Sequence, residues 1–293
     1  MRVLLIIRPG LGCLLAPPLA HVLGQHNCTV VPCLQSGAET YLGTGLLTRL
    51  WRAPGSVTAE ELSTGDVVVV LPGDGPCPGL VRQSSSADPP CEPWAVWVQA
   101  GGPADRGLWV VADGAQRSEA VPSPSFLTAL AESVGQAIVA VATPPDLAGR
   151  RILVTAGPTV EDLDPVRFLS NRSSGRMGIA LALAAWRHGA DVELVHGPLL
   201  TPVPRLASLT AVPVRGARDM HKEVLCRAAA CEAVIMCAAV ADYCPETRSA
   251  TKIKKEGAAL SSLALIRTPD ILAALGALPP PRPVLIGFAA ETD

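Results

Sequence analysis

Small and polar residues follow one apolar run in the second half of the chain. The run Ile152–Thr155 leads into the turn-forming residues Ala156-Gly157-Pro158-Thr159, a polar loop, and then Ser173-Ser174-Gly175. Small residues let a ligand approach the backbone closely, and free N–H groups at a helix N-terminus attract phosphate. With a helix that begins near Ser173 or Ser174, we predict a phosphate site at Gly157, Ser173, Ser174 and Gly175. An ordinary capped helix after a loop would show the same residues.

The elements that position this stretch alternate between strand-like and helix-like segments along the whole chain. Continuous Val/Ile/Leu runs are typical of strands buried on both faces of a parallel sheet. The predicted strands are Val3–Ile7, Thr29–Pro32, Val67–Leu71, Ala95–Val98, Leu108–Val111, Ile152–Thr155, Asp191–Val195, Ala233–Cys237 and Val284–Phe288. Helical stretches such as Ser125–Val141 and Gly178–His188 lie between them, so we predict an α/β fold.

The chain is long enough for two domains. The segment Thr143-Pro-Pro-Asp-Leu-Ala-Gly149 contains two prolines and a glycine, which end the preceding helix and indicate a linker. We therefore predict one domain over residues 1–148 and a second over residues 149–293, each a doubly wound parallel sheet.

The polar loop of the second domain carries a family resemblance. Asp164-Pro-Val-Arg167-Phe-Leu-Ser-Asn171-Arg-Ser-Ser-Gly175 resembles the signature loop of phosphopantothenoylcysteine synthetase, which in bacteria is usually fused behind a flavin-dependent decarboxylase. Further matches follow in the family's order: Cys237-Ala-Ala-Val-Ala-Asp-Tyr243, Lys252-Ile-Lys-Lys255, Arg267-Thr-Pro-Asp-Ile271 and Gly287-Phe-Ala-Ala-Glu-Thr292. The resemblance covers residues 149–293 and implies a Rossmann-like ligase domain behind a flavodoxin-like one.

The resemblance implies a reaction and its substrates. A nucleoside triphosphate, usually CTP in bacteria, activates the carboxylate of 4'-phosphopantothenate as an acyl-cytidylate, and cysteine then displaces CMP. Mg²⁺ would accompany the triphosphate, because a transferring phosphate needs cations that neutralise its developing charge. The family also implies a homodimer in which each active site borrows residues from the partner subunit.

The same resemblance assigns roles to residues. Arg167 and Lys252 would supply cations, and Asn171 would hold the acyl intermediate, because an amide donates to an anion without adding charge. Ala238 and Ala239 would line the pantothenate site through their backbone, with Asp242 beside them. Nucleotide contacts are expected from Lys254, Lys255 and Phe288, together with the phosphate site. Three plainer interpretations stay open: Asp164 as a turn residue, the lysines as a solvated charge run, and Asn171 as a helix cap.

The chain departs from the family in two places. The family continues beyond Gly287-Phe-Ala-Ala-Glu-Thr292 with a helix and a strand, so we expect a ligase domain truncated at its C-terminus. In the first half, no histidine precedes Asp66, Val98-Gln-Ala-Gly-Gly102 replaces a Pro-Ala-Met-Asn element, and no cysteine lies near Asp113-Gly-Ala115. We therefore expect a degenerate decarboxylase relative that binds FMN weakly or not at all. An active bifunctional protein and an inactive nucleotide-binding relative are the alternatives.

Composition excludes several other classes of function. A net charge of −2 and 3% aromatic residues argue against a nucleic-acid surface. Arg8 and Pro9 interrupt the first apolar run, which we interpret as a strand and not a signal peptide. No run reaches the roughly 20 apolar residues that span a bilayer, so we expect a cytoplasmic protein without a membrane partner. Cys226, Cys231, Cys237 and Cys244 show no metal-ligand spacing and are expected to be buried, reduced thiols.

Overall fold

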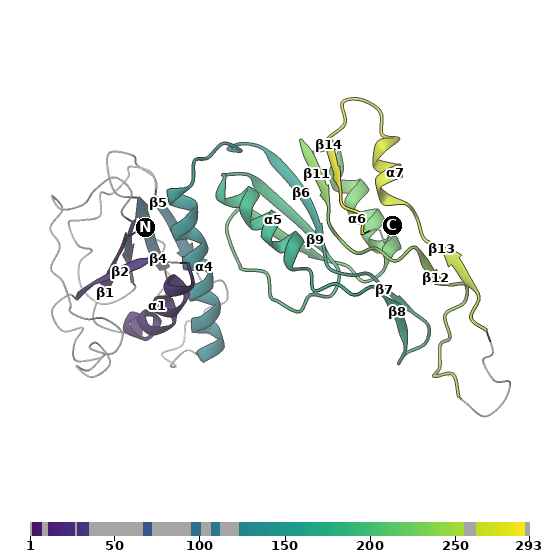
Figure 1. The fold of residues 1–293 in the computed structure, drawn as a ribbon, viewed down its shortest axis with the longest axis horizontal. Coiled ribbons are helices and arrows are strands. Elements are labelled where there is room, and N and C mark those ends of the chain that lie inside the picture. Colours follow the sequence, from purple (N-terminus) through teal and green to yellow (C-terminus); the bar gives the residue numbers. More distant parts are fainter. Residues whose placement is uncertain are drawn as a thin grey trace. The chain divides into compact units, whose positions relative to one another are not determined.

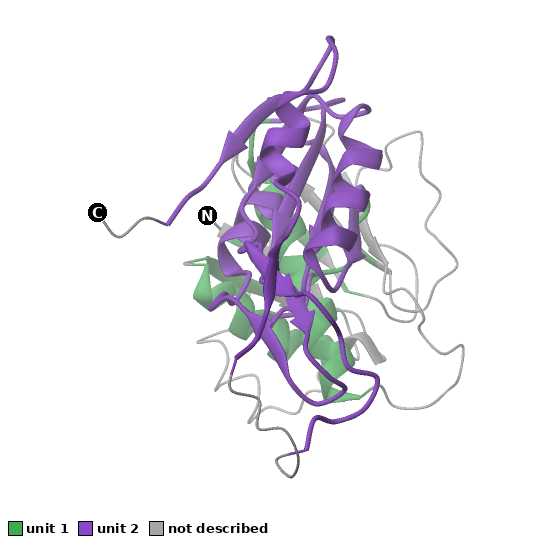
Figure 2. Cartoon of the chain, turned by 90° about the vertical axis from the view of Figure 1, so that its right-hand side faces the viewer, with its two compact units in different colours: residues 1–144, 204–207 green, residues 145–203, 208–293 purple. Residues whose placement is uncertain are grey.

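The chain divides into two compact units. The computed structural model describes residues 2–7, 11–26, 28–34, 67–71, 95–100, 107–111, 123–254 and 262–290. One unit comprises residues 1–144 and 204–207, and the other residues 145–203 and 208–293 (Figure 2). Between them, Thr143 ends helix α4 (Pro124–Ala142) in an extended conformation, which the following proline favours. The sequence placed the boundary four residues further on, after residue 148.

Among the described residues of the first unit, five strands form one sheet. These are β1 (Arg2–Ile7), β2 (Thr29–Leu34), β3 (Val67–Val70), β4 (Ala95–Ala100) and β5 (Gly107–Val111), in the spatial order β2-β1-β3-β4-β5 (Figure 1). Strands β1, β2 and β3 are parallel, as predicted. Strand β4, however, pairs antiparallel with β3 and with β5, which corrects the prediction of an all-parallel sheet. Six residues separate β4 from β5, and a parallel crossover needs about twice as many.

Three residues of β1 belong to the core of the first unit. Val3, Leu5 and Ile7 are fully buried, as the two-residue period of a strand requires. The 3-10 turn Leu11–Leu15 and helix α1 (Ala16–Gln25) follow, and α1 packs against α4. In the part of the chain that the structure describes, only α4 is long and apolar enough to cross a membrane, and half of it is buried within the protein. That burial is typical of a core helix.

The second unit contains an all-parallel sheet. Its strands are β6 (Arg151–Ala156), β9 (Asp191–His196), β10 (Leu209–Pro213), β11 (Ala233–Met236) and β14 (Val284–Gly287), in the order β10-β9-β6-β11-β14 (Figure 1). Leu153, Val154, Leu194 and Val234 are fully buried in its central strands. The predicted α/β fold is therefore confirmed. Strand β10 was not predicted, because it is an exposed edge strand that ends in a proline.

The connections of this sheet run in opposite directions from β6. Helix α5 (Arg176–Arg187) leads from β6 to its neighbour β9, whereas α6 (Ala217–Ala228) leads back from β10 to β11. Helix α7 (Ile271–Gly276) continues the second direction, from β11 to β14. Because parallel crossovers are right-handed, helices of opposite direction cover opposite faces of the sheet, and α6 indeed packs against α7. The strand order reverses between β6 and β11, where doubly wound sheets bind their ligands.

Two short antiparallel pairs extend beyond the carboxyl edge of this sheet. Strand β7 (Val160–Asp162) pairs with β8 (Phe168–Ser170), and β12 (Tyr243–Pro245) pairs with β13 (Leu265–Arg267). Figure 1 shows both pairs at the same end of the unit. Each of these strands has only three residues, so no alternation of apolar and polar residues predicts it from the sequence.

The cysteines of the second unit are free thiols, but not all are buried. Cys231 and Cys244 are buried, Cys237 is half-buried and Cys226 is exposed. Burial raises the pKa of Cys231 to about 11, so this thiol stays protonated. The prediction was wrong for Cys226, because α6 buries Val224 and Ala228 and residue 226 projects from the opposite face.

Candidate functional site

The loops that follow β6 and β11 are hydrogen-bonded to each other at the point where the strand order reverses. Gly157 accepts a hydrogen bond from Ala239 N–H at 2.9 Å, and Thr159 N–H donates to Ala239 at 3.2 Å. Pro158 and Ala239 thus form a short parallel bridge. The predicted residues Gly157, Ala238 and Ala239 therefore lie together at the carboxyl edge of the sheet, where a ligand would bind.

Two buried threonines fix the loop after β11. Thr155 Oγ1 accepts hydrogen bonds from Cys237 N–H at 3.0 Å and Ala238 N–H at 3.1 Å. Thr159 Oγ1 accepts one from Ala241 N–H at 2.9 Å, and both threonines are fully buried. The N–H groups of Ala238 and Ala239 are thus already used within the protein. A substrate on this loop would meet its carbonyl oxygens and methyl groups.

Glycines bring the end of β6 against the start of α5. Gly157 and Gly175 both have positive φ, of 75° and 76°, which side chains rarely allow. A Cβ on Gly175 would lie 3.3 Å from the backbone N and Cα of Gly157 and would overlap Leu199. A Cβ on Gly178 would lie 2.7 Å from the Thr155 oxygen. Helix α5 therefore approaches the sheet more closely than any side chain would permit.

The predicted phosphate site lies at the N-terminus of α5. The helix begins at Arg176 with Gly175 as its N-cap, two or three residues later than predicted. Left-handed Gly175 breaks the helical path, so Ser173 and Ser174 precede the first turn instead of forming it. Their hydroxyls accept long hydrogen bonds from Gly175 N–H (3.3 Å) and Arg176 N–H (3.5 Å). Bonds of this length are weak, and a phosphate oxygen could take their place.

Replacing Gly175 by alanine should therefore destabilise the second unit. We expect a loss of about 1–2 kcal/mol from the left-handed backbone alone, and a lower melting temperature in calorimetry. Gly276→Ala is the matched control, because a Cβ at Gly276 meets no atom within 4 Å. Equal melting temperatures for the two variants would show that the contact between Gly157 and Gly175 is not tight.

Asn171 connects the polar loop to the loop after β11. Its Nδ2 donates to the Val240 carbonyl at 2.9 Å and more weakly to the Ala239 carbonyl at 3.4 Å. With the nitrogen engaged, the side-chain oxygen has no protein partner among the residues that the structure describes. Asn171 is therefore held by the loop of Ala238 and Ala239, and it is not a cap of α5, whose N-cap is Gly175.

Arg167 forms an ion pair with Asp164, for which the sequence also allowed a plain role as a turn residue. Asp164 is 1% exposed, and its Oδ2 accepts from Arg167 Nε at 2.9 Å and Nη2 at 2.6 Å. Burial opposes ionisation of Asp164. Hydrogen bonds from the Arg167 guanidinium and from three backbone N–H groups outweigh it and hold the pKa of Asp164 well below its usual range. The spacing of Asp164 and Arg167 was a signal for this pair, but burial was not visible in the sequence.

The remaining predicted residues are less closely engaged. Lys252 and Lys254 are exposed, and Lys255 lies outside the described residues. Asp242 is exposed, and its carbonyl accepts from Thr268 N–H at 2.9 Å, which ties the Arg267-Thr-Pro-Asp motif to this loop. Phe288 follows β14, with its ring half-exposed, and its N–H donates to the Met236 carbonyl next to Cys237.

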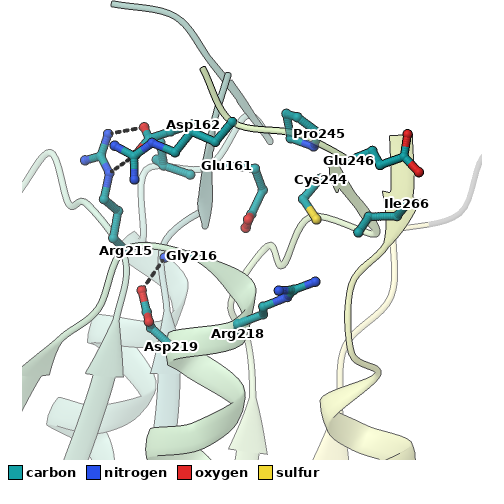
Figure 3. A pocket seen from close by; sticks show the side chains of 12 residues that line it. Glu161, Asp162, Arg215, Gly216, Arg218, Asp219, Cys244, Pro245, Glu246 and Ile266 are labelled. Atoms are coloured by element: carbon teal, nitrogen blue, oxygen red, sulfur yellow. Dashed lines mark hydrogen bonds and ion pairs between the residues drawn. The ribbon is translucent and has the colours of Figure 1, made fainter. Parts of the chain in front are cut away.

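A cavity of about 380 Å³ lies beside this site and was not predicted (Figure 3). It is bordered by β7, the start of α6 and the β12–β13 pair. Asp162 pairs there with Arg215 at 2.6 Å and with Arg248 at 3.1 Å, while Glu161 accepts from Ala217 N–H at 2.7 Å. The hydrogen bonds from Arg215 hold the pKa of Asp162 below its usual range. The contacts with Arg215 and Ala217 connect β7 to the start of α6, and the pair with Arg248 connects β7 to the segment after β12. We assign no ligand to the cavity.

The second unit matches known proteins. Residues 147–293 match the family model described as the DNA/pantothenate metabolism flavoprotein C-terminal domain. The coenzyme A biosynthesis bifunctional protein CoaBC of Vibrio cholerae is 47% identical over 151 residues, which cover 51% of this chain and 37% of that protein. A cysteine/cysteine sulfinic acid decarboxylase from an unknown prokaryotic organism is 47% identical over 147 residues, 50% of this chain and 40% of its own.

Among solved structures, the C-terminal domain of a CoaBC bifunctional protein is 44% identical. The alignment covers 50% of this chain and 67% of that one, with a TM-score of 0.43. The matched part of the chain spans about two fifths of the length of its curated relatives. Through residues 147–293, which are half of its length, the chain belongs to the family of the DNA/pantothenate metabolism flavoprotein C-terminal domain.

Proposed function

We propose that residues 149–293 act as a phosphopantothenate–cysteine ligase of coenzyme A biosynthesis. The observation that carries the proposal is the joining of Asn171 to the loop of Ala238 and Ala239, at the reversal point of a domain whose relatives include CoaBC proteins. In the proposed reaction, the carboxylate of 4'-phosphopantothenate attacks the α-phosphorus of CTP and pyrophosphate leaves. The amine of cysteine then attacks the acyl carbon, and CMP leaves with the bonding electrons.

We assign roles in this reaction to the residues around the point where the strand order reverses. The Gly157 turn and the start of α5, with Ser173, Ser174 and Gly175, would receive phosphate oxygens. Lys252, Lys254 and Lys255 would add positive charge, and Phe288 would offer a ring face to the base. Asn171, Ala238, Ala239 and Asp242 would hold the acyl group.

Mg²⁺ would arrive with the nucleotide in this scheme. Within the described ranges, no three His, Cys, Asp or Glu side chains gather into a metal site. Mg²⁺ commonly keeps several waters and binds through substrate phosphates, so such a cage is not required. The protein would then contribute cationic side chains and backbone N–H groups around the triphosphate.

The proposal is tested by measuring pyrophosphate release. The protein is incubated with CTP or ATP, with and without phosphopantothenate, and cysteine is added afterwards. We expect release that requires phosphopantothenate, and formation of phosphopantothenoylcysteine with CMP only after cysteine is added. Pyrophosphate release that is indifferent to phosphopantothenate would contradict the proposal.

The resemblance of the first unit to a decarboxylase raises a second candidate activity, FMN-dependent decarboxylation. We expect this activity to be absent. The decarboxylation needs a flavin beside a proton-handling group and a loop that grips the substrate. The changes at Asp66, Gly101–Gly102 and Asp113–Ala115 fall outside the described residues, so they remain a prediction from the sequence. The purified protein should be colourless and release no CO₂ from phosphopantothenoylcysteine. A yellow, FMN-loaded preparation that releases CO₂ would overturn this expectation.

We also expect the ligase unit to form a homodimer. The two short strand pairs and the turn between β7 and β8 expose large apolar side chains: Val166 (58%), Phe168 (56%), Tyr243 (49%) and Leu265 (45%). Exposed apolar residues that cluster on neighbouring elements are typical of interaction surfaces. Light scattering at micromolar concentration should give twice the monomer mass, and Phe168→Asp should reduce it to the monomer. A monomeric parent protein would contradict the prediction.

A further inference from the structure

Asp164 makes more hydrogen bonds than a turn residue needs. Its Oδ1 accepts from the N–H groups of Val166 and Arg167, both at 2.8 Å, which closes the turn between β7 and β8. Its Oδ2 accepts from the Arg167 guanidinium and also from Ile253 N–H at 3.2 Å. A local turn uses one oxygen, so the second oxygen serves a different purpose.

That second oxygen holds a segment 89 positions later in the chain. Ile253 N–H donates to Asp164, and the Ile253 carbonyl accepts from Arg167 Nη2 at 2.7 Å. The ion pair therefore satisfies both backbone groups of one residue, as a neighbouring strand would. Charge-assisted hydrogen bonds of this kind are about twice as strong as neutral ones.

A second contact holds the same segment just upstream. Ser249 N–H donates to the Leu163 carbonyl at 2.9 Å, and Ser249 Oγ donates to the Thr251 carbonyl at 2.6 Å. Lys252 therefore lies between two points at which the chain is fastened to the β7–β8 turn. Its side chain is exposed, but its backbone is fixed on both sides.

We propose that Asp164 is a positioning residue for Lys252: with Arg167 it fixes the Ile253 backbone, and so sets where the Lys252 ammonium meets the nucleotide. This inference rests on the proposed ligase function for its catalytic consequence, but not for its structural one. The buried carboxylate is ionised at every working pH, because its hydrogen bonds hold its pKa well below the usual range. The ion pair is therefore present at every working pH, and it holds the Ile253 backbone in place throughout.

Asp164→Asn removes the contacts to the Arg167 guanidinium and to Ile253 but keeps those that close the turn. The amide oxygen can still accept from Val166 and Arg167 N–H, whereas the NH₂ group cannot accept from the Arg167 guanidinium or from Ile253 N–H. We expect kcat/KM for the nucleotide to fall about 100-fold, because small misplacements of a catalytic group have effects of this size. Glu193→Gln is the matched control, since Glu193 lies on β9 and pairs with Arg227 on α6, so its loss removes an ion pair that does not touch the Lys252 segment.

A double-mutant cycle shows whether Asp164 acts through Lys252. If it does, Asp164→Asn should reduce activity about 100-fold in the parent protein but only slightly when Lys252 is already Gln. The same cycle with Glu193→Gln should be additive. Additive losses for Asp164→Asn and Lys252→Gln would overturn the inference, because a purely structural defect multiplies with the loss of the lysine.

Limited trypsin digestion gives a readout that needs no ligase activity. Cleavage after Lys252 and Lys254, measured by mass spectrometry relative to cleavage after Lys222, should rise about tenfold in Asp164→Asn, because a local opening governs such cleavage. Arg167→Gln, at a side chain that is 45% exposed, should do the same if the aspartate variant folds poorly. Unchanged cleavage in both variants would show that Asp164 and Arg167 do not hold the Lys252 segment in place. A faster cleavage without pyrophosphate release by the parent protein would refute the ligase function alone.

Discussion

Asn171→Asp is expected to abolish the cysteine-dependent step while leaving nucleotide binding nearly intact. The amide nitrogen of Asn171 faces the carbonyl oxygens of Val240 and Ala239. A carboxylate oxygen in its place would repel both, and its charge would also repel the anionic acyl intermediate. Loss of one donor from a site of this kind reduces turnover about 10²–10³-fold, and the added charge should lower it further.

The two half-reactions can be measured separately. Pyrophosphate release reports activation of the carboxylate, and CMP release after cysteine is added reports transfer. We expect the aspartate variant to keep the first and lose the second. Asn171→Ala is the control that removes the amide without adding charge, and it should be impaired less. Equal losses of nucleotide affinity and of transfer would show that Asn171 serves the nucleotide and not the acyl group.

The strands of the second unit could be predicted because their signal is local and strong. Runs such as Ile152–Thr155 and Asp191–Val195 fall within strands that differ by at most one residue at either end. Their burial on both faces is what a continuous apolar run encodes. The three-residue strands β7, β8, β12 and β13 carry no such run, since each is stabilised by its partner strand and the loops around it.

Backbone geometry accounts for the errors at element boundaries. Gly175 adopts a left-handed conformation that the packing against Gly157 selects, and this moves the start of α5 beyond both serines. The antiparallel pairing of β4 with β5 follows from a connection of six residues, a length that is visible in the sequence. The wrongly predicted features thus depended on contacts between distant segments or on the length of a connection.

The residues of the candidate site also differ in how far the sequence could predict their roles. The loop from Gly157 to Gly175 was visible because its small residues follow a strand directly. The part played by Asp164 was not visible, because its partner Ile253 lies 89 positions away and offers only backbone groups. Likewise, Thr155 and Thr159 looked like ordinary strand and turn residues, yet their buried hydroxyls fix the Ala238 loop. Contacts from a side chain to a distant backbone leave no pattern in the sequence.

Lys252→Gln should weaken triphosphate binding and turnover together. A lysine held between Ser249 and Ile253 is an exposed cation whose backbone cannot move far, so its charge can be directed at a phosphate without much loss of entropy. Glutamine keeps most of the length but not the charge, and we expect about a 100-fold loss in kcat/KM for the nucleotide. Lys222→Gln is the matched control, because Lys222 is an exposed lysine on α6, and it should leave the rate unchanged.

Salt provides a further check on the origin of the loss. If the ammonium acts on the triphosphate, raising the ionic strength should weaken nucleotide binding more in the parent protein than in Lys252→Gln, because screening removes only an interaction that is present. Binding is measured by titration with a nucleotide analogue that cannot be cleaved. A variant that turns over normally at low nucleotide, with the salt dependence of the parent, would show that Lys252 belongs to a solvated surface, and the cation at the phosphates would then have to come from Lys254 or Lys255.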